Sequence, residues 1–323
     1  MVMDFGFNIP NGGPLAHNDD IIAIAKKGEA CGYRILAIPD HIIIPRTIGA
    51  NYPYSPDGTL TFATLGGGEC LEPLALMASV AGQTTSARLL TSVMVVPYRE
   101  PMLTAKLVST IDHLSGGRTI LGCGAGWMPE EFVAVGAPPF AERGKVTDEY
   151  IDIYRELWTK EAPSFKGKYR QFGDLYFAPK PKQRPHPPIW VGGESPAAMR
   201  RAVKRGDAWY PIGCNPSHPL DTIARFRAAI DTLKRMMDEE KRDPKTLDLA
   251  YWSVWTSSTG APAKASDGNR MMLTGSADDI AANINELRLL GVNHVLFNFL
   301  AATRSETLDR IEAFAHNVIG KIR

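Results

Sequence analysis

Hydrophobic and polar residues alternate along this chain in a regular order of short and long segments. The short segments are rich in β-branched and aromatic residues, and they predict strands near residues 2–8, 34–39, 88–96, 118–123, 188–191, 207–212, 247–256 and 292–299. The long segments carry apolar residues about 3.6 positions apart, which predicts amphipathic helices between the strands. These helical series are Val146-Tyr150-Ile153-Leu157, Ile223-Phe226-Ile230-Leu233, Ile280-Ile284-Leu287 and Leu308-Ile311-Phe314-Val318.

This alternation predicts a parallel sheet whose strands are joined by right-handed helical crossovers. About eight strand–helix pairs are enough to close the sheet into a (β/α)8 barrel, or TIM barrel. A doubly wound open sheet is the alternative, although it usually has fewer repeats. Because barrels often reach this length, we expect a single domain over residues 1–323. Ser276, followed by Asp279, predicts the start of a late helix.

Three segments interrupt the alternation and predict long loops. Residues 42–70 follow the second predicted strand and are rich in Gly, Pro and Tyr. Residues 160–187 contain an aromatic hairpin followed by a proline-rich basic connector, and residues 257–274 follow the seventh predicted strand. In a barrel the first and third loops lie at the carboxyl ends of strands, where barrel enzymes have their active sites.

The composition narrows the class of protein further. Of the 323 residues, 44% are hydrophobic and 22% are charged, and the formal net charge is +1. These values are typical of a globular protein without a basic surface for nucleic acid. No apolar stretch has the ~18 residues of a membrane helix, and the N-terminus does not resemble a signal peptide. We therefore expect a cytoplasmic protein with reduced cysteines and no membrane or nucleic-acid partner.

Several familiar catalytic motifs are missing from the sequence. It contains no H-E-x-x-H, no Walker P-loop, no G-x-S-x-G and no His/Cys spacing typical of a metal site, so we expect no bound metal. Tryptophan side chains at predicted strands are candidates for the wall of an aromatic ligand pocket, although core packing explains most of them equally well. They are Trp127, Trp190, Trp209, Trp252 and Trp255.

A glycine-rich stretch, GCGAGW over residues 122–127, follows the fourth predicted strand. It is not a dinucleotide-binding fingerprint, because Trp127 occupies the place of the third glycine and no acidic residue follows about 20 positions on. Glycines lack a Cβ atom and allow the backbone to approach a flat ring or a phosphate closely. A tight strand exit without a ligand is the alternative interpretation.

Two other strand ends carry polar residues. The stretch GGES, residues 192–195, precedes a predicted helix that Glu194 or Ser195 would cap, and the exposed amides of such a helix start bind anions. Asp40 and His41 follow the second strand, where His41 would exchange a proton near neutral pH and Asp40 would orient or charge it. A purely structural role is the alternative for each.

Taken in order, these pieces resemble the bacterial luciferase-like superfamily, in particular its branch of coenzyme F420-dependent oxidoreductases. The resemblance rests on AIPDHIIIP (37–45), on the run from LLTSVMVVPYREP to YRELW (89–158) and on PPIWVGGESP to DAWYP (187–211), so it covers nearly the whole chain. It implies a luciferase-like TIM barrel that binds FMN or its 5-deazaflavin relative, coenzyme F420, at the carboxyl ends of its strands. It also implies a non-proline cis peptide bond around Ser92-Val93.

The resemblance further assigns roles to residues of this chain. Asp40 and His41 match a pair that contacts the cofactor and transfers a proton in deazaflavin-dependent sugar-phosphate dehydrogenases. The expected cofactor-binding residues are Asp40, Ser92, Val93, Gly124, Gly126, Trp127, Arg143, Gly192, Gly193, Glu194 and Ser195. Within this set the residues from Ser92 to Trp127 would lie beside the ring, whereas Glu194, Ser195 and Arg143 would take the phosphate.

Two departures from the family pattern bear on function. Trp127 stands where the sugar-phosphate dehydrogenases have a catalytic glutamate, which argues against that substrate. Ala125 stands near where luciferase has a phosphate-binding arginine, which weakens the FMN interpretation. The first hypothesis is therefore an F420-dependent oxidoreductase that transfers a hydride to or from a small organic substrate, with His41 exchanging the proton. The alternatives are an FMNH2-dependent two-component monooxygenase and a non-catalytic flavin-binding barrel.

The partners follow from the same resemblance. We expect a homodimer that pairs through helices near the second and third strands, together with a reductase that supplies reduced flavin or F420. The substrate would meet Tyr52, Tyr54 and Phe62 of the loop after the second strand, and residues 257–274. These segments contain aromatic and small residues without a charged cluster, which favours an apolar, neutral substrate.

Overall fold

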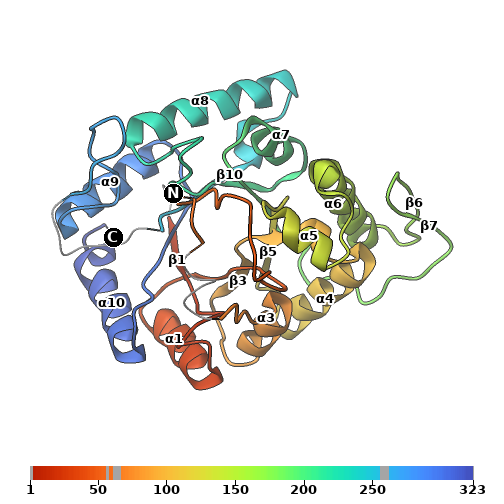
Figure 1. Ribbon diagram of the computed structural model, residues 1–323, viewed down its shortest axis with the longest axis horizontal. Coiled ribbons are helices and arrows are strands. Elements are labelled where there is room, and N and C mark those ends of the chain that lie inside the picture. The colour runs from red at the N-terminus through yellow and green to blue at the C-terminus, as the bar shows by residue number, and fades with distance from the viewer. Residues whose placement is uncertain (1–2, 56–57, 61–66, 255–261, 323) are drawn as a thin grey trace.

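The computed structural model describes residues 3–55, 58–60, 67–254 and 262–322 (Figure 1). Its strands run parallel in the order β3-β2-β1-β11-β10-β9-β8-β5-β4, and β3 also pairs with β5, so the sheet closes into a barrel. The barrel strands are β1 (Asp4–Asn8), β2 (Ile35–Ile38), β3 (Arg88–Thr91), β4 (Met94–Val95), β5 (Thr119–Gly124), β8 (Ile189–Gly192), β9 (Ala208–Tyr210), β10 (Asp248–Trp252) and β11 (His294–Phe297). The predicted (β/α)8 barrel is confirmed, and the open-sheet alternative is wrong.

The third barrel position is divided between two short strands. β3 pairs with the start of β5 through Leu89 and Leu90, and β4 pairs with its end through Met94 and Val95. The peptide bond between Ser92 and Val93 is cis, at the interruption between them. The single strand predicted over 88–96 is therefore two, and the predicted cis bond is present.

Helices surround the barrel on its outside, as Figure 1 shows. They are α1 (Asn18–Ala30), α3 (Pro73–Ala81), α4 (Pro101–Leu114), the short α5 (Pro129–Ala134), α6 (Arg143–Thr159), α7 (Pro196–Arg205), α8 (Ile223–Glu239), α9 (Ala277–Leu289) and α10 (Arg304–Asn317). The four predicted helical series lie in α6, α8, α9 and α10, except that Val318 of the last series is the C-cap residue just after α10. Ser276 caps α9 in a capping box with Asp279, as the sequence predicts.

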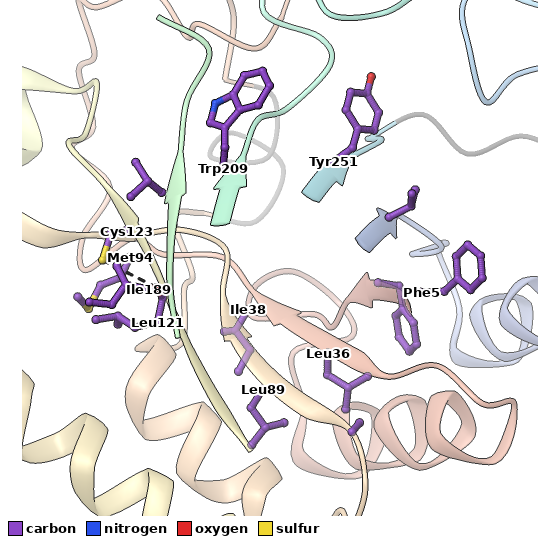
Figure 2. Packing of buried hydrophobic residues seen from close by; sticks show 14 of the residues in the cluster. Phe5, Leu36, Ile38, Leu89, Met94, Leu121, Cys123, Ile189, Trp209 and Tyr251 are labelled. Atoms are coloured by element: carbon purple, nitrogen blue, oxygen red, sulfur yellow. Dashed lines mark hydrogen bonds between the residues drawn. The ribbon is translucent and has the colours of Figure 1, made fainter. Parts of the chain in front are cut away.

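Two apolar layers follow from the alternation of side chains along each strand. The larger layer lies between barrel and helices; Figure 2 shows Leu36, Ile38 and Leu89 in this layer on neighbouring strands. The smaller layer fills the barrel interior with side chains that include Ile35, Leu90 and Trp190. The barrel is thus packed through its middle, and ligand chemistry is confined to its ends.

The predicted loops are present where the structure describes them. The segment after β2 runs to α3, and residues 160–187 contain the antiparallel hairpin of β6 (Phe165–Lys166) and β7 (Gln171–Phe172). Phe62 and Trp255 lie outside the described residues. All four cysteines are free thiols. Among the described helices none is long and apolar enough to cross a membrane, and the described His, Cys, Asp and Glu residues form no group of three that could hold a metal ion.

Candidate active site

The carboxyl ends of the strands form the mouth of the barrel, which is lined by a ring of inward-facing residues. Side chains alternate between the two faces of a strand, so a residue two positions after one that fills the barrel interior also points inward. Ser92 and Tyr210 meet across this mouth, with their hydroxyl oxygens 2.9 Å apart. Within the described part of the chain, Asn8 Oδ1 and Trp252 Nε1 are buried and have no hydrogen-bond partner. An acceptor near the end of β1 and a donor near the end of β10 are therefore buried without a partner.

Val93 enters the same mouth between two glycines. A Cβ atom on Gly124 would lie 2.6 Å from Val93 Cγ2, and one on Gly192 would lie 2.9 Å from Val93 Cγ1. Gly126 has a φ of +83°, and its Cβ would meet Phe132 and Val95 at 2.7 Å. The glycines thus allow close packing of β4, β5 and β8 around Val93, in addition to any approach by a ligand.

Asp40 is held by an arginine that the sequence analysis did not select. Arg99 donates two hydrogen bonds of 2.8 Å to its two carboxylate oxygens, and Val95 N donates another of 2.7 Å. Arg99 also pairs with Glu72 at 2.8 Å, and these bonds raise the pKa of Arg99 although burial opposes them. Such a bidentate pair holds the end of β2 against β4. Arg99 belongs to the YREP stretch, which was noticed only as part of the family pattern.

His41 has a different carboxylate partner, Glu131. Its Nδ1 lies 2.7 Å from Glu131 Oε2, and both residues are buried. The carboxylate in contact with His41 is therefore that of Glu131, whereas the sequence analysis expected Asp40, which binds Arg99 instead. The only sequence signal for Glu131 was the PEEF stretch after the glycines, which is typical of a helix start.

Aromatic side chains lie beside His41. The Trp127 ring stands edge-on to the His41 ring, with 6.4 Å between centroids, and the Tyr52 ring lies 5.2 Å from Trp127. Tyr54 packs against Tyr52 at 5.6 Å. The loop after β2 and the glycine-rich stretch after β5 are thereby in contact. Trp190 and Trp209, by contrast, belong to the apolar core.

The start of α7 has the features of an anion site. Ser195 is its N-cap and accepts a hydrogen bond from Ala198 N, Pro196 follows, and Gly193 has a φ of +107°. Arg143, at the start of α6, stacks on Phe140 at 4.0 Å. Burial, and secondarily the positive charge of Arg201, lower the pKa of Arg143.

Glu194 uses its carboxylate inside the protein. It accepts hydrogen bonds from Ile212 N at 2.8 Å and from Asn215 Nδ2 at 2.9 Å, which ties the loop after β8 to the loop after β9. Burial raises the pKa of Glu194 from 4.5 to about 7. Of the residues expected to take a phosphate, Glu194 therefore contributes loop geometry, whereas Ser195 and Arg143 offer donors.

A closed parallel barrel with a buried histidine–carboxylate pair at its carboxyl end defines a TIM-barrel enzyme. A model of the luciferase-like monooxygenase family matches residues 3–265, and the chain belongs to that family. The family of luciferase-like monooxygenases makes it an oxidoreductase. The identification agrees with the resemblance noted in the sequence.

Individual relatives show what this chain is similar to. The uncharacterized protein Rv0940c of Mycobacterium tuberculosis is 39% identical over 211 residues, which are 64% of this chain and 69% of that protein. The FMNH2-dependent dimethylsulfone monooxygenase of Pseudomonas putida is 28% identical over 293 residues, covering 78% of each chain. An F420-dependent secondary alcohol dehydrogenase, solved with an F420–acetone adduct, superposes with a TM-score of 0.74 at 17% identity over the whole of both chains. The last likeness concerns the fold alone.

Proposed function

We propose that this protein is an F420-dependent oxidoreductase that transfers a hydride to or from a small organic substrate. The observation that carries the proposal is the buried His41–Glu131 pair at the barrel mouth, beside Trp127. Hydride transfer between an alcohol and a carbonyl compound must be accompanied by transfer of the hydroxyl proton, and a histidine held in one orientation is suited to this task.

The residues at the mouth fit a flavin or deazaflavin ring. The pyrimidine edge of either ring carries both N–H donors and carbonyl acceptors. Asn8 Oδ1 and Trp252 Nε1, the buried unpartnered acceptor and donor described above, would be complementary to such an edge once binding uncovers them. Val93 and the backbone of Gly124 and Gly126 would support the face of the ring.

The phosphate end of either cofactor also finds suitable groups. The amides at the start of α7, beyond Gly193 and Ser195, form a helix terminus that favours an anion. Arg143 adds a positive charge, whereas the nearby Arg201 is already paired with Asp148 at 2.6 Å. Burial, and secondarily Arg201, lower the pKa of Arg143.

A deazaflavin held by these residues would supply the hydride chemistry. His41 takes the proton from the substrate hydroxyl in oxidation and returns it in reduction. Trp127 and Tyr52, whose ring centroids lie 5.2 Å apart, would cover the bound ring and keep water from it. Arg99 is occupied by Asp40 and Glu72 and does not offer its charge to a ligand. The aromatic wall accordingly favours a neutral, apolar substrate.

A second candidate function is supported by the likeness to the FMNH2-dependent dimethylsulfone monooxygenase. In this version reduced FMN from a partner reductase supplies the chemistry of oxygen activation, and the same histidine exchanges protons at the ring edge. Only FMN supports this reaction, because deazaflavin lacks the ring nitrogen on which oxygen activation depends. The choice of cofactor therefore separates the two functions.

The deciding experiment is an anaerobic fluorescence titration of the apoprotein with coenzyme F420 and with FMN. We expect F420 to bind with a micromolar or lower Kd and FMN to bind at least tenfold more weakly. The reverse order would contradict F420-dependent hydride transfer and favour the monooxygenase. Tight binding without turnover on a broad panel of alcohols and ketones would instead favour a non-catalytic barrel.

The role of His41 is tested separately by His41→Ala. Because general acid–base catalysis contributes about 10²–10⁴-fold to a rate, we expect kcat to fall by at least about 100-fold. The Kd for the cofactor should change by less than about threefold, since the proposed ring and phosphate contacts involve other residues. Turnover at the wild-type rate would remove His41 from the mechanism.

A further inference from the structure

We propose that Glu131 is a positioning residue that fixes the tautomer of His41, so that Nδ1 carries the proton and Nε2 is the nitrogen that exchanges protons with the substrate. This inference rests on the proposed function only where it assigns a use to Nε2. The tautomer itself is a property of the protein without any cofactor.

The carboxylate of Glu131 is surrounded by hydrogen-bond donors. Tyr98, from the 3-10 turn Val96–Tyr98, donates its hydroxyl at 3.0 Å to Oε2, the oxygen that also faces His41 Nδ1 at 2.7 Å. Ile42 N donates at 2.8 Å and Ile43 N at 3.3 Å to Oε1. An ionised carboxylate has about four acceptor sites. Three of them are engaged here by Tyr98, Ile42 N and Ile43 N, and His41 Nδ1 faces the carboxylate as its fourth neighbour.

This arrangement determines which nitrogen of His41 bears the proton. The backbone amides can only donate, and Tyr98 donates to the charged oxygen it faces, so Glu131 acts as an acceptor throughout. An unprotonated Nδ1 would place its lone pair 2.7 Å from a carboxylate oxygen in a buried site, which is strongly unfavourable. Neutral His41 is therefore protonated at Nδ1 and presents Nε2 as the acceptor.

The local fold makes the pair rigid. Glu131 lies in the first turn of α5, and its side chain is fully buried beneath the loop after β2. Because Glu131 also binds the amides of Ile42 and Ile43, the two residues that follow His41, the imidazole and its partner are held by the same carboxylate. A turn of the ring would break its contact with Oε2, while the two backbone amides keep the carboxylate in place.

The first test is direct and needs no cofactor. The protein is labelled with 15N-histidine, and a long-range 1H–15N correlation spectrum assigns the tautomer of His41 near pH 8, with His41→Gln identifying its signals. We expect the Nδ1–H tautomer in the wild type. In Glu131→Gln the amide NH2 can face Nδ1, and we expect the Nε2–H tautomer to be populated. A wild-type His41 protonated at Nε2 overturns the proposal.

The second test is kinetic and uses a matched control. Loss of the correct histidine tautomer in a comparable catalytic arrangement costs up to about 10⁴-fold in kcat, so we expect Glu131→Gln to lower kcat by about 10²–10⁴-fold. The Kd for the cofactor should change less than about threefold. Glu130→Gln is the control, because the adjacent carboxylate of Glu130 accepts from Gly49 N and Ala50 N and an amide oxygen can replace it.

The outcomes separate this inference from the proposed function. If the spectrum shows the Nδ1–H tautomer but neither cofactor supports turnover, the function fails and the positioning role stands. If Glu131→Gln shifts the tautomer while kcat stays within threefold of the wild type, the positioning role is overturned although the enzyme is active. Melting temperatures of both variants, measured alongside, identify a loss of activity that is due to unfolding. In that event the Glu131→Asp variant replaces Glu131→Gln: it keeps the charge on a shorter arm, and a wild-type kcat from it would overturn the proposal.

Discussion

Asp40 and His41 are neighbours in the chain, yet their side chains serve different networks. Asp40 binds Arg99 and the amide of Val95, and so joins the end of β2 to the end of the divided third strand. His41 binds Glu131 on α5. Successive residues at a strand end point in opposite directions, so one peptide can serve both a structural ion pair and a proton-transfer group.

Glu194 is a third carboxylate in the site, and its environment differs from those of Asp40 and Glu131. It is 6% exposed and bonded to an amide and a side-chain amide, without a cation among its hydrogen-bond partners. Burial of a carboxyl without a cation disfavours the charged form, which explains its raised pKa of about 7. The loop that Glu194 holds is therefore sensitive to pH in the neutral range.

We predict a pH-dependent difference in stability between the wild type and Glu194→Gln. The folded chain holds the proton more tightly than the unfolded chain, so the wild type is most stable, relative to the variant, below pH 4.5. That advantage falls as the pH rises from 4.5 to about 7, by roughly 3 kcal/mol in all, and is constant above this range. Urea unfolding of both proteins at pH 4.5, 6 and 8 measures this difference in the free energy of unfolding. A difference that is the same at all three pH values would contradict the prediction.

At the scale of elements, the glycines of β5 and β8 have a packing role that their spacing does not reveal. They leave room for Val93, which enters the barrel mouth from the break between β3 and β4. α5 acts on the neighbouring loop in a related way. Its two consecutive glutamates bind the loop after β2 at two places, Glu131 at Ile42 and Glu130 at Gly49. A short helix thus organises a long loop.

We predict that Gly124→Ala destabilises the protein and that Val93→Ala suppresses the effect. The added Cβ would lie 2.6 Å from Val93 Cγ2, and overpacking of this kind costs about 1–3 kcal/mol. The double variant removes the colliding methyl groups and should recover at least half of the loss. Urea denaturation gives the free energies of unfolding.

Gly82→Ala is the control for that comparison, because its φ is −75° and its Cβ would meet only Ser79 O at 3.7 Å. This variant should be within about 0.5 kcal/mol of the wild type. If Gly124→Ala were equally neutral, the close packing around Val93 would not constrain β5.

At the scale of the whole molecule, the barrel brings together strand ends that are far apart in sequence, and the outer helices cover it (Figure 1). One outer helix, α4, exposes an apolar face. Leu103, Leu107 and Leu114 are 60%, 39% and 63% exposed and lie on one side of the helix. Because α4 follows the third barrel position, we propose this face as the contact of the homodimer expected from the family resemblance.

We predict that the protein sediments as a dimer at micromolar concentration and that Leu107→Glu shifts it to a monomer. A glutamate at the centre of an apolar contact would be buried without a partner. The free-energy cost of burying its charge is far larger than that of leaving it on an open surface. Leu289→Glu is the control, since Leu289 is 85% exposed on α9, away from α4. Sedimentation velocity measures the outcome, and a wild-type monomer would contradict the prediction.

The sequence by itself determined the barrel and the location of its site. Strands and helices are local patterns, and about eight repeats leave few ways to close a parallel sheet, so the strand ends that carry Asp40, Gly124 and Ser195 had to meet. The family resemblance added the cis bond at Ser92-Val93 and the class of cofactor. The expected cytoplasmic location and the cofactor-binding residues stay predictions.

Only the tertiary structure decided which side chains act on one another. Glu131 and His41 are 90 positions apart, and Arg99 and Asp40 are 59 apart. Nothing in the local pattern distinguishes Glu131 from Glu130, although one is fully buried against an imidazole and the other holds a backbone loop. Pairing of charged groups depends on burial and distance in three dimensions, and these quantities exist only after the strands have closed into a barrel.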